Sequence, residues 1–108
     1  MINVTIYQDS KQQNCGFQIK GHAGYAESGY DIICASVSAL SINCINSIER
    51  FTDDAFETAC EEESGFLELM VKSVSMESKL LLDSFVLGLA QIEESYGSQF
   101  IQVRFEEV

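Results

Sequence analysis

The feature that most constrains the fold of this chain is a repeated switch in the spacing of its apolar residues. Over residues 2–7 and again over 15–20, apolar and polar residues alternate, which predicts two strands that each bury one face. The polar run 8–14 between them predicts a hairpin connection. From Ile33 the apolar spacing changes to three or four residues, which predicts an amphipathic helix of about five turns. Its buried stripe is expected to contain Val37, Leu40, Cys44, Ile45, Ile48 and Phe51.

The second half of the chain repeats this pattern of two strands followed by a helix, and then adds a strand. The predicted helix is expected to begin after the cap Ser75 and to end at Gly97, and Gly88 inside it indicates close packing against another element. The expected elements are strands over Phe56–Glu61 and Phe66–Lys72, the helix over Met76–Tyr96, and a strand within 100–108. The inward residues are expected to be Leu82, Phe85, Val86, Leu89, Ile92 and Tyr96 on the helix, and Ile101, Val103 and Phe105 on the last strand.

The resulting order, β-β-α-β-β-α-β, predicts a two-layer α/β sandwich. Each helix has one apolar stripe to bury, so both helices are expected to pack on a mixed, mostly antiparallel sheet. The 108 residues suit one domain over 1–108, and a hydrophobic share of 46% is enough to fill one core.

The charge of the chain argues against several classes of function. It has 17 acidic and 6 basic residues, and the basic residues are scattered, so direct nucleic-acid binding is not expected. The acidic surface suits a basic partner, although it is equally explained by solubility alone. We find neither a run of eighteen apolar residues nor a secretory signal at the start, so we expect a cytoplasmic protein that does not span a membrane.

The four cysteines are expected to be thiols, because nothing in the sequence indicates export to an oxidising compartment. Cys15, Cys44 and Cys60 each fall on an apolar face and are interpreted as small buried hydrophobic residues. No two cysteines have metal-ligand spacing and the chain has one histidine, so neither a metal site nor a cofactor is expected.

The remaining cysteine, Cys34, lies twelve residues after that histidine, His22, in the stretch GHAGYAESGYDIICASVSAL. If Asp31 caps the helix, Cys34 falls in the first turn, where free amides favour a thiolate. A loop containing Gly24 and Gly29 can return His22 to the thiol, giving a nucleophile and a base at one place. From spacing alone, a core cysteine, a surface histidine and a simple cap remain open.

The same stretch resembles the signature of the ribosomal-processing cysteine proteases, the Prp family, and the resemblance extends over essentially the whole chain. The residues that carry it are Gly21, His22, Gly24, Gly29, Asp31, Ile32, Ile33, Cys34, Ala35 and Ser38. It implies a cysteine endopeptidase with His22 and Cys34 catalytic, Asp31 and Ser38 supporting, and a substrate loop containing Gly21, Gly24 and Gly29. It also implies a homodimer that removes the N-terminal extension of large-subunit ribosomal protein twenty-seven, cutting after paired phenylalanines.

Two other functions are compatible with the residues. One is a non-catalytic ribosome-assembly protein that holds a basic ribosomal partner on its acidic surface. The other is a thiol redox sensor, which needs a second cysteine near Cys34. Cys44 is about 15 Å away along the predicted helix, which leaves Cys15 and Cys60.

Overall fold

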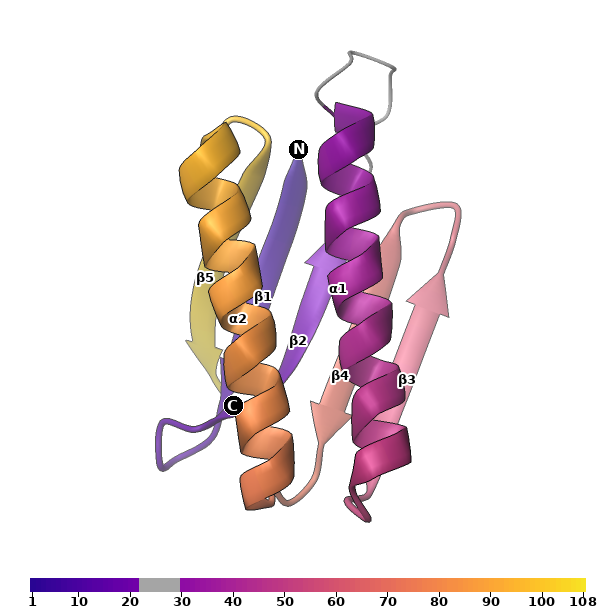
Figure 1. Cartoon of the computed structure of the whole chain (residues 1–108), viewed down its shortest axis with the longest axis vertical. Helices are drawn as coiled ribbons and strands as arrows, with labels where there is room; N and C mark the ends of the chain where they lie inside the picture. The colour runs from indigo at the N-terminus through magenta and orange to yellow at the C-terminus, as the bar shows by residue number, and fades with distance from the viewer. Residues whose placement is uncertain (22–29) are drawn as a thin grey trace.

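The computed structural model describes the backbone of residues 1–21 and 30–108, and the side chains of all of these except Tyr30 and Asp31. Two antiparallel helices lie side by side over one face of a five-stranded sheet, which confirms the two-layer sandwich (Figure 1). The elements follow the expected order β-β-α-β-β-α-β: β1 Ile2–Gln8, β2 Asn14–Lys20, α1 Tyr30–Phe51, β3 Phe56–Glu61, β4 Phe66–Val71, α2 Met76–Tyr96 and β5 Ile101–Glu107.

The strands are arranged in the order β3-β4-β2-β1-β5, which no pattern in the sequence specified. Strand β1 pairs antiparallel with β2 and parallel with β5, while β4 pairs antiparallel with both β2 and β3. The sheet is therefore mixed and mostly antiparallel, as expected. The hairpin β3–β4 forms one edge and lies beside α1, and β5 forms the other edge.

The core lies between the sheet and the inner stripes of the two helices. The three central strands contribute fully buried residues such as Val4, Phe17 and Leu69, and the rings of Phe17 and Phe85 lie with centroids 4.4 Å apart. Both helices bury the middle of their predicted stripes. The buried helix residues of this core are Ile33, Val37, Cys44, Ile48, Leu82, Phe85 and Leu89.

Residues at the ends and edges of the elements depart from the sequence prediction. Phe51 and Tyr96 are the last residues of their helices and are 70% and 45% exposed. Phe105 and Cys60 lie on the edge strands β5 and β3 and are exposed as well. These four residues were expected to be buried, but the periodicity of a segment does not show where the covering layer ends.

The packing of α1 against α2 explains the glycine inside the second helix. A Cβ added to Gly88 would lie 3.0 Å from Cδ1 of Leu40, so the glycine lets this leucine approach the α2 backbone. Ser75 caps α2 as predicted, since its side chain accepts a hydrogen bond from the Ser78 amide, and Gly97 ends the helix with a φ of 99°.

By length and composition, α1 is the one described helix able to cross a membrane, with a mean hydropathy of 1.4 over Ile32–Phe51. Core helices of globular proteins pass the same test. Here α1 lies against the sheet and contributes Ile33, Val37 and Ile48 to the core.

Candidate active site

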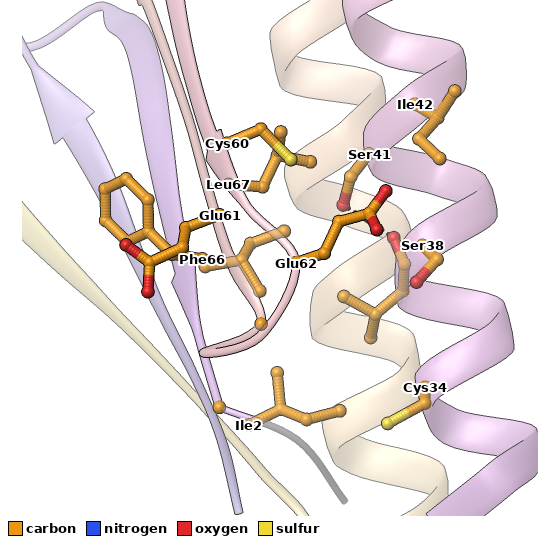
Figure 2. A pocket seen from close by; sticks show the side chains of 14 residues that line it. Ile2, Cys34, Ser38, Ser41, Ile42, Cys60, Glu61, Glu62, Phe66 and Leu67 are labelled. Carbon is orange, nitrogen blue, oxygen red and sulfur yellow. Dashed lines mark hydrogen bonds between the residues drawn. The ribbon is translucent and has the colours of Figure 1, made fainter.

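Cys34 opens into a groove between α1 and the β3–β4 hairpin, with a volume of about 360 Å³. Figure 2 shows the thiol at one end of the groove, with Ser38, Ser41 and Ile42 following it along the helix. Ile2, at the start of β1, and Gly21, just after β2, also line the groove, and Figure 2 shows Ile2 beside Cys34. The thiol is half-buried rather than sealed in the core, so a peptide can reach it.

The helix places Cys34 two residues further from its start than the sequence suggested. Helix α1 begins at Tyr30, so Asp31 lies inside the first turn rather than before it, and Cys34 is the fifth residue rather than the third. Side chains on a helix lean toward its N-terminus, so the sulfur of a fifth residue lies over the first turn. The thiol therefore leans toward the backbone amides of the first turn, which have no hydrogen-bond partner within the helix.

Ser38 lies one turn after Cys34, is exposed and lines the same groove. Residues four apart share a face of a helix, and this explains why the cysteine and the serine occur together there. Ser41 follows on the buried side of the groove, where its hydroxyl donates a hydrogen bond to the Val37 carbonyl. The helix therefore presents a thiol and two hydroxyls to one cavity.

Gly21 directly follows β2, and two features of the structure require a glycine at this position. Its φ is 104°, a conformation that side chains with a Cβ rarely adopt. A Cβ at this position would also lie 2.3 Å from the carbonyl oxygen of Met1, a contact that only a shift of the backbone relieves. Gly21 therefore fixes the direction in which the chain leaves the sheet toward residue 22.

The remaining predicted site residues lie outside the part of the chain that the structure describes. These are His22, Gly24 and Gly29, together with the side chain of Asp31. The meeting of the Cys34 thiol with the His22 imidazole therefore stays a prediction, and among the residues described no cluster of three metal-ligating side chains occurs.

The groove also contains residues that the sequence did not indicate as functional. The β3–β4 hairpin supplies the wall facing α1, through Cys60, Glu62 and Leu67 among others. These residues follow Cys34 by more than twenty-five positions. A local sequence pattern cannot predict their place in the groove, because it does not show which hairpin lies beside which helix. The strand order, which puts β4 and β3 under α1, brings them there.

The four cysteines of the chain, all described and all thiols, differ in their surroundings. Burial raises the pKa of the Cys44 thiol to about 12. Burial, reinforced by the nearby carboxylate of Asp9, also raises the pKa of Cys15. Cys34 and the exposed Cys60 both line the groove. The two cysteines that line this groove are thus separate from the two that are buried.

The chain matches one protein family over nearly its whole length. The sequence model of the family described as Cysteine protease Prp covers residues 1–102. The chain is 29% identical over 98 residues to the ribosomal processing cysteine protease Prp of Staphylococcus aureus strain Mu50, spanning 90% of this chain and 92% of that protein. It is 27% identical over 103 residues to the protein of the same name from Bacillus subtilis strain 168, spanning 89% of this chain and 90% of that one.

The fold leads to the same group of proteins. A crystal structure of an essential ribosomal processing protease Prp from S. aureus, in complex with a covalently linked product peptide, superposes with a TM-score of 0.87. The two sequences are 26% identical, and the match covers 98% of this chain and all of that one. The five-stranded mixed sheet and the two helices follow the same order in both.

Proposed function

This chain belongs to the Prp family of ribosomal-processing cysteine proteases, and we propose that it removes the N-terminal extension of large-subunit ribosomal protein twenty-seven. The observation that carries the proposal is a half-buried cysteine at the end of a groove of about 360 Å³. The S. aureus relative holds a peptide in covalent linkage, which a cysteine nucleophile explains.

In the proposed mechanism, the sulfur of Cys34 attacks the carbonyl carbon of the scissile bond. His22 accepts the thiol proton and gives it to the departing amine as the carbon–nitrogen bond breaks. The acyl group is then held as a thioester on Cys34. Water, which loses a proton to His22, attacks this thioester, releases the carboxylate and restores the thiol.

The charge that develops on the carbonyl oxygen needs hydrogen-bond donors, and the first turn of α1 supplies them in this proposal. Each donor aimed at such an oxyanion contributes about 10²–10³ in rate, and proton transfer by histidine contributes about 10²–10⁴. Asp31 supports the site from the first turn, where the helix dipole favours a carboxylate. Ser38 supports it from the next turn, where its exposed side chain lines the groove that the substrate would occupy.

The groove suits the substrate that we propose. Its lining is mainly apolar and includes Ile42, Phe66 and Leu67, so it can bury the aromatic rings of a paired-phenylalanine motif. The surface of the protein is strongly acidic, with a net charge of −11, and it favours the approach of a basic ribosomal protein. We further propose that the protein works in the cytoplasm as a homodimer, for which light scattering on the purified protein is the test.

The decisive experiment is mass spectrometry of a peptide that spans the extension, after incubation with the wild-type protein and with the Cys34→Ser variant. We expect the wild type to cut after the phenylalanine pair and the variant to leave the peptide whole. A peptide that stays whole with the wild type, yet binds it, would identify a non-catalytic ribosome-assembly protein instead. Cleavage by the variant would remove Cys34 from the mechanism.

A further inference from the structure

The wall of the groove that faces α1 combines apolar side chains with a carboxylate. Of the fourteen described residues that line the groove, most are apolar or small, and Glu61 and Glu62 are the charged ones. No lysine or arginine is among them. One basic group lies beside the lining, because the Nζ of Lys20 is 5.9 Å from the ring centroid of Phe66. A ligand that fills this groove therefore meets negative charge over an apolar floor.

The two glutamates point in different directions. In Figure 2 the side chain of Glu62 extends from the hairpin toward α1, with its carboxylate facing Ser38 and Ser41. The side chain of Glu61 extends away from α1, on the side of Phe66. Among the residues that the structure describes, the ion pairs are Lys72 with Glu57 and Lys79 with Asp83, and neither pair involves the groove. Among the lining residues that the structure describes, Glu62 is thus the carboxylate that points across the groove toward α1.

The position of Glu62 along the groove defines which part of a peptide would meet it. Its carboxylate faces the stretch of α1 that begins at Ser38, four residues after Cys34, and continues toward Ile42, eight residues after it. A helix rises 1.5 Å per residue, so this stretch lies about 6–12 Å from the level of the thiol. An extended peptide advances about 3.3 Å per residue, so a residue two to four positions from the scissile bond reaches it.

We infer that Glu62 determines part of the specificity of this protease, by binding a lysine or arginine of the substrate two to four residues from the bond that is cut. The apolar floor takes the aliphatic stem of such a side chain, and the carboxylate takes its charged end. This inference rests on the proposed function, because it assigns one contact of the peptide that Cys34 would cleave. The preferred substrates are therefore peptides with one basic residue at a defined distance from the cleavage site.

The expected effect is moderate, because Glu62 is exposed to solvent. Ion pairs of this kind contribute about 0.2–1 kcal/mol, which corresponds to roughly a 1.4- to 5-fold change in KM. The contact serves binding and not the chemical step, so it should leave kcat unchanged. It should also weaken in about 1 M salt, where charges are screened within about 3 Å.

The test uses ten-residue peptides that contain one phenylalanine pair and are otherwise alanine and glutamine, with a single lysine moved through the four positions on each side of the cleavage site. KM and kcat are measured by mass spectrometry for the wild type, Glu62→Gln and Glu62→Lys. Glu107→Gln is the matched control, because Glu107 is an exposed carboxylate on β5, at the opposite edge of the sheet. Binding of the same labelled peptides to Cys34→Ala is measured by fluorescence anisotropy.

We expect lysine at one position to lower KM about 1.4- to 5-fold relative to glutamine, an advantage that Glu62→Gln removes and Glu107→Gln retains. In Glu62→Lys, a glutamate-bearing peptide should become the better substrate. The inference is overturned if lysine gives no advantage at any position, or if its advantage survives in Glu62→Lys. If the wild type cuts none of the peptides, the proposed function fails. In that case the anisotropy data still decide whether Glu62 selects lysine.

Discussion

Two cysteines on the same helix show how far position, rather than residue type, sets chemical behaviour in this protein. Cys34 and Cys44 lie ten residues apart on α1, about 15 Å along its axis. Cys34 is half-buried and lines a groove, whereas Cys44 is 4% exposed and belongs to the core. Burial raises the pKa of Cys44 to about 12, so its thiolate is scarce at neutral pH. One end of α1 is thus suited to chemistry and the other to packing.

The difference arises from what each part of the helix faces. At Cys44 the stripe of α1 points into the core, among residues such as Ile48 and Leu69. Cys34 lies in the first part of the helix, near the start of β1 and the end of β2. There a groove separates the helix from the hairpin β3–β4. The part of α1 around Cys44 is packed in the core, and it therefore holds the part around Cys34 in a fixed position.

The largest expected effect is the loss of peptide cleavage when the sulfur of Cys34 is removed. Cys34→Ala should abolish peptide cleavage, a loss of at least about 10³-fold, because it removes the sulfur that attacks the scissile carbonyl in the proposed mechanism. Its unfolding free energy should change by no more than about 1–2 kcal/mol, as for most single substitutions. Both are measured on the same preparation, by mass spectrometry and by chemical denaturation.

Cys44→Ala is the matched control, because it removes the same atom from the core. It should cost about 1 kcal/mol in stability and leave the cleavage rate per folded molecule unchanged. If Cys44→Ala lowers the cleavage rate as much as Cys34→Ala does, then Cys34 and Cys44 do not have the separate roles that we assign to them.

The next effect concerns the base. His22→Ala should lower kcat about 10²–10⁴-fold, because the thiol then lacks its proton acceptor and the amine its donor. Steady-state kinetics on the peptide substrate measures this change. A loss below tenfold would assign His22 a structural role and leave Cys34 without a general base.

Alkylation compares the cysteines directly, without substrate. Iodoacetamide should label Cys34 at pH 7 at least about 100-fold faster than Cys44, because the thiolate fraction of Cys44 is on the order of 10⁻⁵ at that pH. Since its pKa is raised, labelling of Cys44 in the folded protein should increase about tenfold per pH unit between pH 7 and 10. Peptide mapping gives both rates. Faster labelling of Cys15, Cys44 or Cys60 than of Cys34 would contradict the site.

Much of this architecture could be predicted from local patterns. The switch between spacings of two and of three or four predicted each strand and α2 to within about a residue, and the start of α1 to within two or three residues. Ser75, Gly88 and Gly97 were interpreted correctly, because caps and close packing depend on neighbours in sequence or on one face of a helix. Periodicity failed where burial depends on other elements. Phe105 and Cys60 alternate as inward residues should, yet they are exposed because their strands lie at the edges.

The site was predictable in part for the same reason. Cys34 was predicted from a short motif and Ser38 from its place one turn away on the same face, and both line the groove. Glu62 belongs to a hairpin whose place beside α1 follows from the strand order β3-β4-β2-β1-β5, a set of long-range pairings with no local signal. The helix also starts two residues earlier than predicted, because Asp31 suits a first-turn position as well as a cap.

The smallest effect is expected at the packed end of α1, where a carboxylate joins the two helices. Asp54 follows α1 by three residues, and its Oδ2 accepts hydrogen bonds from the Ser75 amide at 3.0 Å and the Ser75 hydroxyl at 2.6 Å. That hydroxyl in turn accepts a hydrogen bond from the Ser78 amide at 3.2 Å. Asp54 thereby orients the residue that caps α2.

The hydrogen bonds from Ser75 hold the pKa of Asp54 below its ordinary value, so its carboxylate stabilises the folded state whenever it is ionised. The stabilisation is complete above the ordinary aspartate pKa of about 3.9 and is lost as the pH falls through the lower folded value. Asp54→Ala should therefore lower the unfolding free energy at pH 7 by about 1–2 kcal/mol, with a smaller difference from the wild type at pH 3. Chemical denaturation at the two pH values measures this.

Cleavage per folded molecule should not change in Asp54→Ala, because Asp54 is not among the residues that line the groove. A drop in kcat without a loss of stability would mean that the packed end of α1 acts on the chemistry.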